Sequence, residues 1–318
     1  MTVIALEEHF IPADLIDQVW PSRPPVTASG TLVENLMDLG DHRLRVMDAA
    51  GVDIQVLSVA APAAQDVPAE VAVPLARQLN DRAAAAVAAH PDRFRALASL
   101  PTPDPAAAVA EARRAVTELG FVGVIVNGHT GGRFLDTPEY QPLLSAIEEL
   151  GVPLYLHPTY PPAAVRQAYF GDLEPAIGGA LASAAWGWHA ETGLHVLRLA
   201  ATGVFDRHPG LRVVVGHMGE NLPFSLMRAD HRLNLACPGA RPVAEIVREH
   251  VYLTICGYAT VPPLQCALSV FGADRILFST DYPFGDPAEH VEFLAGAPIS
   301  PLDRDRIAHL NAERLFNL

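Results

Sequence analysis

Short apolar runs alternate with longer amphipathic stretches along the whole 318-residue chain. The apolar runs are typical of buried strands, and the stretches between them have helical spacing. The predicted strands are residues 3–8, 54–59, 94–100, 122–126, 153–157, 212–216, 251–255 and 275–279. Strands that alternate with helices indicate a parallel α/β fold, and eight of them predict a closed (β/α)8 TIM barrel.

Residues that start and stop helices support this pattern. Asp104-Pro105 before an alanine-rich run predicts an N-cap with proline at the first helical position, and Gly120 predicts the end of that helix. A second helix is predicted over residues 70–89, where Pro74 must fall in the first turns or break the helix. A third is predicted over residues 191–206.

Two long segments interrupt the alternation. Residues 11–40 contain several prolines and a Thr/Ser/Gly stretch, and residues 158–187 are also irregular in pattern. We expect both to be loop insertions, after the first and fifth strands, of the kind that lines barrel active sites. The sequence has no internal repeat, low-complexity linker or compositional break, so residues 1–318 are predicted to form one domain.

Composition narrows the class of protein. Half of the residues are hydrophobic, enough for a large core, but no apolar run approaches the roughly 20 residues that span a bilayer. The N-terminus lacks the basic region and cleavage site of a secretory signal, so we expect a cytoplasmic protein. The formal net charge of −14 argues against nucleic acid as a partner, because phosphates demand a basic surface.

The chain contains no lysine, and all 22 of its basic residues are arginine. This excludes a Schiff-base lysine, lysine-bound pyridoxal phosphate and a carbamylated lysine between two metals. The three cysteines have no CxxC spacing and are predicted to be reduced, partly buried thiols. A metal site must therefore use His, Asp, Glu or Cys.

Four such residues stand at predicted strand ends: Glu7, His9, His157 and Asp281. Period-two geometry puts Glu7 and His9 on the inward face of the first strand and Glu8 on the other face. Singly, each could be an ordinary polar strand-end residue, and Asp281 could cap a helix. Together, at strands that converge in a barrel, they predict a site for one divalent metal, Zn²⁺ or Mn²⁺.

His217, at the end of the sixth strand, remains as a catalytic base or acid. Glu220, three residues later, is placed to accept the proton of the His217 ring and fix its tautomer, or else is simply an acid in a first helical turn. Arg228 on the next helix is a candidate carboxylate clamp, with a solvated helix face as the alternative. Asn127, just past the fourth strand, is predicted to reach the pocket, and His189 is a further candidate.

Two other chemistries lack their motifs. There is no GxSxG elbow of a serine hydrolase, and no GxGxxG follows the first strand as a common dinucleotide site requires.

These motifs resemble the amidohydrolase superfamily, and more closely its branch of γ-resorcylate, 2,3-dihydroxybenzoate, 5-carboxyvanillate and aminocarboxymuconate-semialdehyde decarboxylases. The resemblance covers residues 5–10, 43–59, 90–94, 120–123, 156–158, 205–209, 216–220 and 278–284. It implies that Glu7, His9, His157 and Asp281 hold one Zn²⁺ or Mn²⁺. It further implies a catalytic pair of His217 and Glu220, Asp281 as proton donor to the ring, and Arg228 as a substrate contact.

Some positions depart from that pattern. Asn221 stands where glycine is expected in the benzoate enzymes, and Tyr282 stands where tryptophan is common. The loop over residues 128–138 is shorter than expected, and residues 159–171 have their own pattern. These segments help to shape the pocket, so the departures bear on the substrate rather than on the metal site.

The first functional hypothesis is metal-dependent, non-oxidative decarboxylation of an ortho-hydroxylated aromatic acid, with no organic cofactor. The alternative is a metal-dependent hydrolase or hydratase that acts on a lactone, an amide or a related small carbonyl compound. A purely structural metal site is disfavoured, because such sites are usually closed and cysteine-rich. The expected partner is a small-molecule carboxylate, and analogy with the family implies a homodimer or homotetramer.

Overall fold

The computed structural model describes residues 2–20 and 30–318, so residues 21–29 of the first predicted insertion lie outside the described part. Its strands are β1 Ile4–Phe10, β2 Ile54–Val59, β3 Phe94–Ser99, β4 Gly123–Asn127, β5 Leu154–His157, β6 Val213–Val215, β7 Val251–Thr254 and β8 Ile276–Leu277. All eight predicted strands are confirmed, with bounds that differ by at most two residues.

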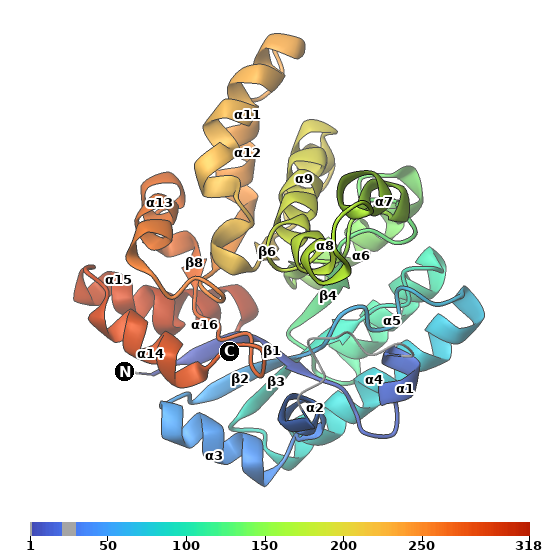
Figure 1. Ribbon diagram of the computed structural model, residues 1–318, viewed down its shortest axis with the longest axis vertical. Coiled ribbons are helices and arrows are strands. Elements are labelled where there is room, and N and C mark those ends of the chain that lie inside the picture. Colours follow the sequence, from blue (N-terminus) through green and yellow to red (C-terminus); the bar gives the residue numbers. More distant parts are fainter. Residues whose placement is uncertain (1, 21–29) are drawn as a thin grey trace.

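The eight strands form one parallel sheet in the order β1 to β8 (Figure 1). Each strand pairs with the next along the chain. A parallel bridge between Leu6 and Ser279 joins β1 to the end of β8, and Leu6 N–H donates to Phe278 O at 3.1 Å. The sheet therefore closes on itself, as the predicted (β/α)8 barrel requires.

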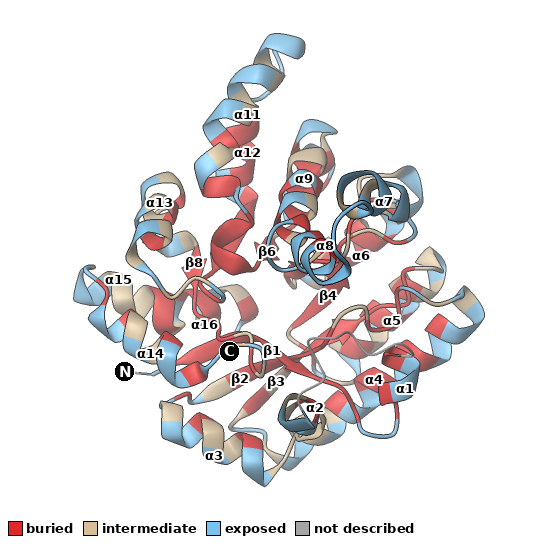
Figure 2. Cartoon of the chain, in the orientation of Figure 1, coloured by how far each residue is buried: buried red, intermediate tan, exposed pale blue. Residues whose placement is uncertain are grey.

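Two apolar layers hold this barrel together, and alternation along each strand separates them. The inner layer fills the barrel with side chains from the strands: Ile4, Leu6, Val56, Leu97, Ile125, Tyr155, Val214, Tyr252 and Leu277. The outer layer packs between strands and helices, and includes Val213 and Val215 on either side of Val214. The strands are almost entirely buried, whereas most helices bury one side and expose the other (Figure 2).

Helices surround the barrel in the alternation that the sequence predicts. They are α1 Ile16–Val19, α2 Gly30–Met37, α3 Asp41–Ala50, α4 Ala69–Ala89, α5 Pro105–Thr117, α6 Gln141–Leu150, α7 Ala163–Phe170, α8 Pro175–Ala182, α9 Gly187–Ala201, α10 Val204–Arg207, α11 Leu222–Ala236, α12 Val243–His250, α13 Val261–Phe271, α14 Pro287–Gly296, α15 Pro301–Asp305 and α16 Asn311–Phe316. Short η segments are Pro138–Tyr140, His217–Gly219, Ala273–Arg275 and Arg306–Leu310. None of the helices in the described ranges has both the length and the hydrophobicity to cross a membrane.

The predicted helix signals are confirmed in α4 and α5. The Asp104 carboxylate accepts from the N–H groups of Ala106 and Ala107, both at 3.0 Å, and Pro105 opens α5. Pro74 lies in the second turn of α4 without ending it.

Other predictions are wrong in detail. The segment over residues 158–187 is largely helical, because Pro162 and Pro175 stand at the starts of α7 and α8, where a missing N–H costs nothing. The first insertion likewise contains α2. The helix predicted over residues 191–206 begins earlier, at Gly187, and stops at Ala201, since Gly203 adopts a left-handed φ of 74°.

Candidate active site

A β-bulge in β1 sets the orientation of the first two candidate ligands. The pairing register with β2 shifts between Ala5 and Glu8, and Glu7 has a φ of 62°. Leu6 lies inside the barrel, so strict alternation would turn Glu7 outward. The bulge instead brings Glu7 and His9 inward and leaves Glu8 outside, as predicted but by a different route.

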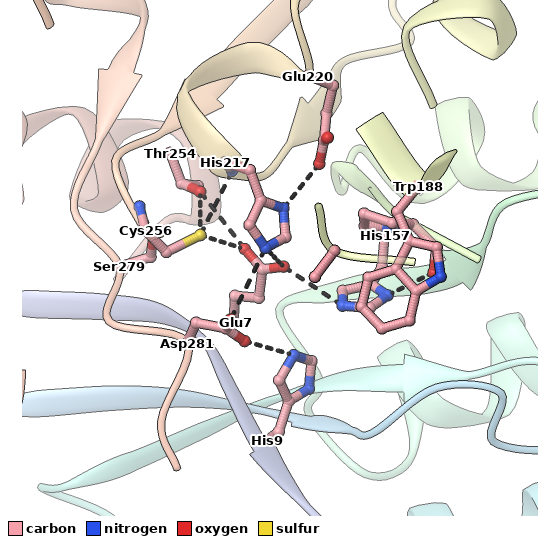
Figure 3. Close-up of polar contacts among 12 residues, drawn as sticks. Glu7, His9, His157, Trp188, His217, Glu220, Thr254, Cys256, Ser279 and Asp281 are labelled. Carbon is pink, nitrogen blue, oxygen red and sulfur yellow. Dashed lines mark hydrogen bonds and ion pairs between the residues drawn. The ribbon is translucent and has the colours of Figure 1, made fainter. Parts of the chain in front are cut away.

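The four predicted ligands meet at the carboxyl end of the barrel (Figure 3). His157 Nε2 lies 3.4 Å from Glu7 Oε1, and His9 Nε2 lies 3.2 Å from Asp281 Oδ1. Donor atoms of Glu7, His9 and His157 all lie within 4.8 Å of one another, and these three side chains are buried. β1, β5 and the segment after β8 therefore supply one cluster of oxygen and nitrogen donors.

Both imidazoles are held with Nε2 toward this cluster. His157 Nδ1–H donates to Pro158 O at 2.8 Å, and His9 Nδ1 hydrogen-bonds Ser58 Oγ at 3.0 Å. Burial, reinforced by the neighbouring His9 and His217, lowers the pKa of His157 to about 3. His157 is therefore neutral at pH 7, the state in which imidazole binds metals.

The contact between Glu7 and His157 provides a test for a metal. Because Nδ1 of His157 carries the proton, its Nε2 presents a lone pair to Glu7 Oε1 at 3.4 Å. Within the described chain, Glu7 Oε1 has no hydrogen-bond partner although it is buried. Burial raises the pKa of Glu7, and two buried acceptors that face each other need a proton or a metal cation shared between them. The donor set therefore fits a divalent metal ion.

His217 stands beside this cluster, on the short segment after β6. Its Nδ1 donates to Glu220 Oε1 at 2.8 Å, and its Nε2 lies 3.7 Å from Asp281 Oδ2. The second Glu220 oxygen accepts from His189 Nδ1 at 2.6 Å. His217, Glu220 and Asp281 all have left-handed φ values, a strain that tends to concentrate at functional sites.

Neighbouring charges and hydrogen bonds shift the pKa values of Glu220, His217 and Asp281. Burial opposes the charged form of Glu220, but His217 and the hydrogen bond from His189 outweigh it and lower the pKa of Glu220 to about 2. Burial likewise opposes protonation of His217, yet its acidic neighbours Cys256, Glu220 and Glu7 hold its pKa well above the ordinary value. The pKa of Asp281 is lowered, because hydrogen bonds with His217 and His9 outweigh desolvation.

Comparison with known proteins identifies the family. The chain matches the amidohydrolase family (Amidohydro_2) over residues 11–318. The chain is a member of the amidohydrolase family. A γ-resorcylate decarboxylase of Rhodococcus jostii (strain RHA1) is 41% identical over 331 residues, which cover 99% of this chain and 98% of that protein. The predicted resemblance is therefore confirmed.

Solved structures agree with this assignment. A 2,6-dihydroxybenzoate decarboxylase in complex with 2,6-dihydroxybenzoate superposes with a TM-score of 0.92 at 38% identity and covers 100% of both chains. A dihydroxybenzoic acid decarboxylase from Polaromonas sp. JS666, with bound manganese and the inhibitor 2-nitroresorcinol, gives a TM-score of 0.91 at 37% identity. That match covers 100% of this chain and 97% of the Polaromonas chain.

Several residues around Glu7 in this amidohydrolase were not among the predicted site residues. Glu7 Oε2 accepts hydrogen bonds from Tyr155 OH and from Cys256 Sγ, the latter at 2.9 Å, and Thr254 Oγ1 lies 3.4 Å away. Cys256 was expected only as a partly buried thiol, but it is fully buried beside the candidate metal ligands. Since Tyr252 faces the barrel interior, period two along β7 was the signal that points Thr254 and Cys256 inward.

The two predicted substrate contacts lie in different environments. Asn127 ends β4, pairs in register with His157, and is buried with no hydrogen-bond partner for Oδ1 among the described residues. Arg228 lies on α11 and is exposed. The structure thus brings Asn127 to the cluster but leaves Arg228 outside it.

Gly216 offers a direct probe of the Glu7 position. A Cβ at Gly216 would lie 2.8 Å from Glu7 Oε2 and 3.0 Å from Oε1, while the backbone itself is compatible with alanine. Gly216→Ala is therefore expected to displace the Glu7 carboxylate and weaken Mn²⁺ binding about 10-fold or more, by the scale of perturbed metal-ligand support. Isothermal titration with Mn²⁺ measures this. Gly296→Ala on α14, where a Cβ meets nothing within 4 Å, is the matched control; equal affinities for both variants would contradict the prediction.

Proposed function

We propose that this amidohydrolase is a metal-dependent decarboxylase of an ortho-hydroxylated aromatic carboxylic acid. The observation that carries the proposal is the convergence of Glu7, His9, His157 and Asp281 beside His217, in a chain whose full-length relatives are decarboxylases. These relatives favour decarboxylation over the hydrolase alternative.

Glu7, His9, His157 and Asp281 would hold one divalent ion, either Mn²⁺ or Zn²⁺. The facing acceptors of Glu7 and His157 support such an ion, and manganese is bound in the Polaromonas decarboxylase. When bound, the ion supplies Lewis-acid stabilisation of negative charge on substrate oxygens. No organic cofactor is needed, because exchange of a carboxylate for a proton changes no oxidation state outside the substrate.

Asp281 and His217 would transfer the proton that replaces the carboxylate. Asp281 would take up a proton from protonated His217 and deliver it to the ring carbon that carries the carboxylate, where a new C–H bond forms. The bond from that carbon to the carboxylate then breaks, its electron pair returns to the ring, and CO₂ leaves. His217 Nε2, 3.7 Å from Asp281 Oδ2, is placed to return a proton to Asp281, and Glu220 holds the other ring nitrogen.

Asn127 and Arg228 are the candidates for substrate recognition. Asn127 Oδ1, which has no hydrogen-bond partner among residues 2–20 and 30–318, supports a hydrogen bond with a substrate hydroxyl. Arg228 would bind the substrate carboxylate or a ring substituent by its resemblance to the aromatic decarboxylases, but its exposure on α11 gives no support within a single chain.

Glu220→Gln tests the role of the histidine pair. Glutamine has one acceptor oxygen where Glu220 accepts from both His217 and His189, so one imidazole loses its partner. We expect kcat to fall about 10- to 100-fold, by the scale of lost supporting hydrogen bonds, with bound metal unchanged. Steady-state kinetics and metal analysis measure both quantities. Glu245→Gln on the exposed side of α12 serves as the control, and an unchanged kcat for Glu220→Gln would contradict the role.

We further propose a single-domain, cytoplasmic protein that assembles as a homodimer or homotetramer. Large apolar side chains are exposed on two parts of the outer surface: Phe224 (91%) and Met227 (55%) on α11, and Tyr169 (70%) and Ile177 (55%) on α7 and α8. Exposed apolar groups of this size favour protein–protein contact. Light scattering on the purified chain tests the assembly, and a monomer at micromolar concentration would contradict it.

The decisive functional experiment is mass spectrometry of products from metal-loaded protein and a panel of hydroxybenzoates, beginning with 2,6-dihydroxybenzoate. Lactones and amides are included as substrates of the alternative function. We expect loss of one carboxyl group from an ortho-hydroxylated acid, abolished by a chelator, and gain of label from ¹³C-bicarbonate in the reverse direction. Hydrolysis of a lactone or amide with no change in any hydroxybenzoate would contradict the proposal.

A further inference from the structure

A fully buried polar cluster lies on the outer side of the barrel, behind the candidate metal site. We call it the outer clamp, and its members are Glu8, Arg43, Gln55 and Thr280, each 0% exposed. A buried carboxylate and guanidinium are costly to desolvate, so their packing alone does not explain their presence. None of these side chains faces the interior of the barrel, so none is a direct contact for substrate or metal.

Glu8 ties β1 to the segment after β8. Its Oε1 accepts from Thr280 N–H at 2.9 Å, and its Oε2 accepts from Thr280 Oγ1 at 2.7 Å. Gln55 Nε2 on β2 donates to the same Oε2 at 3.0 Å. One side chain thus holds Thr280 through two groups, and Thr280 immediately precedes Asp281.

Arg43, on α3, secures the other side of the cluster. Its Nη2 donates to His9 O at 2.6 Å, and its Nη1 donates to Gln55 Oε1 at 3.3 Å. The guanidinium also lies 4.8 Å from the centroid of the Tyr282 ring, and His9 N–H donates to Tyr282 O at 2.6 Å. The backbone at His9 and at Tyr282 is therefore fixed from α3.

These contacts hold the backbone of three of the four candidate ligands. Glu7 and His9 flank Glu8, and Asp281 lies between Thr280 and Tyr282. Glu7 and Asp281 have φ values of 62° and 59°, which non-glycine residues adopt only when surrounding contacts impose them. The outer clamp supplies such contacts on both sides of the β1–β8 seam.

We propose that Glu8 and Arg43 are positioning residues that set the spacing between Glu7, His9 and Asp281, and thereby the metal affinity and the aim of the Asp281 carboxylate. This inference rests on the proposed metal-dependent function. The outer clamp thus acts on the geometry of the metal site and not on the global stability of the protein alone.

Thr280 allows a mild test, because its hydroxyl and its volume can be changed separately. Thr280→Val keeps the shape but loses the bond to Glu8 Oε2, whereas Thr280→Ser keeps the hydroxyl and loses a methyl group. We expect the Mn²⁺ dissociation constant of Thr280→Val to rise about tenfold, and that of Thr280→Ser to stay close to wild type. Glu8→Gln places an amide N–H₂ where Glu8 accepts hydrogen bonds from Thr280 and Gln55. This variant is expected to raise the Mn²⁺ dissociation constant about 10- to 100-fold.

Glu111→Gln is the matched control. Glu111 is also buried and also bonded to an amide and a guanidinium, Asn80 Nδ2 at 2.7 Å and Arg114 Nη2 at 2.7 Å, but it lies between α4 and α5, away from the site. Its substitution is expected to lower Tm without changing Mn²⁺ affinity.

Titration of each full-length variant with Mn²⁺, followed by calorimetry, gives the readout, with Tm of the metal-free protein measured alongside. Weaker binding in Thr280→Val and Glu8→Gln, but not in Thr280→Ser or Glu111→Gln, supports the outer clamp. Wild-type affinity in both clamp variants overturns it, while metal binding and turnover by the wild type leave the proposed function standing. If the wild type binds neither Mn²⁺ nor Zn²⁺, the metal site and the clamp fail together.

Discussion

Asp281→Asn is expected to lower kcat for decarboxylation by about 10²–10⁴-fold, the usual contribution of a positioned general acid. Asparagine keeps the size of the side chain and an oxygen toward His9, but it cannot take up a proton from His217 and pass it to the ring carbon. The carboxylate that is lost lies 3.2 Å from His9 Nε2 and 3.7 Å from His217 Nε2, so both histidines lose a charged partner as well. Steady-state kinetics at saturating Mn²⁺ separates the loss of turnover from weaker metal binding.

The matched control is Asp286→Asn, a change of the same chemistry five residues further on. Asp286 caps α14 by accepting from Ala288 N–H at 2.9 Å, and asparagine is an equally good cap. This variant is expected to keep wild-type kcat and Tm. A folded Asp281→Asn protein that turns over at the wild-type rate would remove Asp281 from the chemistry.

Removal of the divalent metal by a chelator is expected to abolish turnover, and one equivalent of Mn²⁺ or Zn²⁺ is expected to restore it. Without a cation, Glu7 Oε1 and His157 Nε2 face each other as buried acceptors at 3.4 Å. A ligand that binds only the folded state also stabilises it, by about 2.7 kcal/mol at a free concentration of 100 times Kd. Tm should therefore rise with added metal, in parallel with activity.

His157→Ala provides the control for this experiment. The variant removes one candidate metal ligand. It should show a smaller rise of Tm with Mn²⁺ and little recovery of activity. Full activity after exhaustive chelation, with metal analysis confirming less than one equivalent per chain, would contradict a metal-dependent mechanism.

The barrel was predictable because each strand and helix is encoded by a local hydrophobic pattern that repeats along the chain. Eight apolar runs separated by helical stretches permit few arrangements, and polar residues just past the strand ends must gather at one end of a parallel barrel. His157 and Asp281, far apart in sequence, meet at the same cluster as His9 for this reason.

What escaped prediction depends on contacts between distant segments. The bulge at Glu7 cannot be read from an alternation rule, because it breaks that rule. Glu8 and Arg43 look like ordinary surface charges in the sequence, and only their shared burial with Gln55 and Thr280 reveals the outer clamp. Arg228 stays a prediction from resemblance, and it lies exposed on α11.

The most direct test of the central claim is the mass of the product formed in D₂O enriched in ¹⁸O, with the metal-loaded enzyme and a hydroxybenzoate substrate. Decarboxylation with protonation of the ring predicts a phenol that carries one deuterium at the carbon that lost the carboxylate, and no ¹⁸O. An unchanged hydroxybenzoate, beside a lactone or amide that gains ¹⁸O from solvent under the same conditions, would instead show hydrolysis and would contradict decarboxylation as the function.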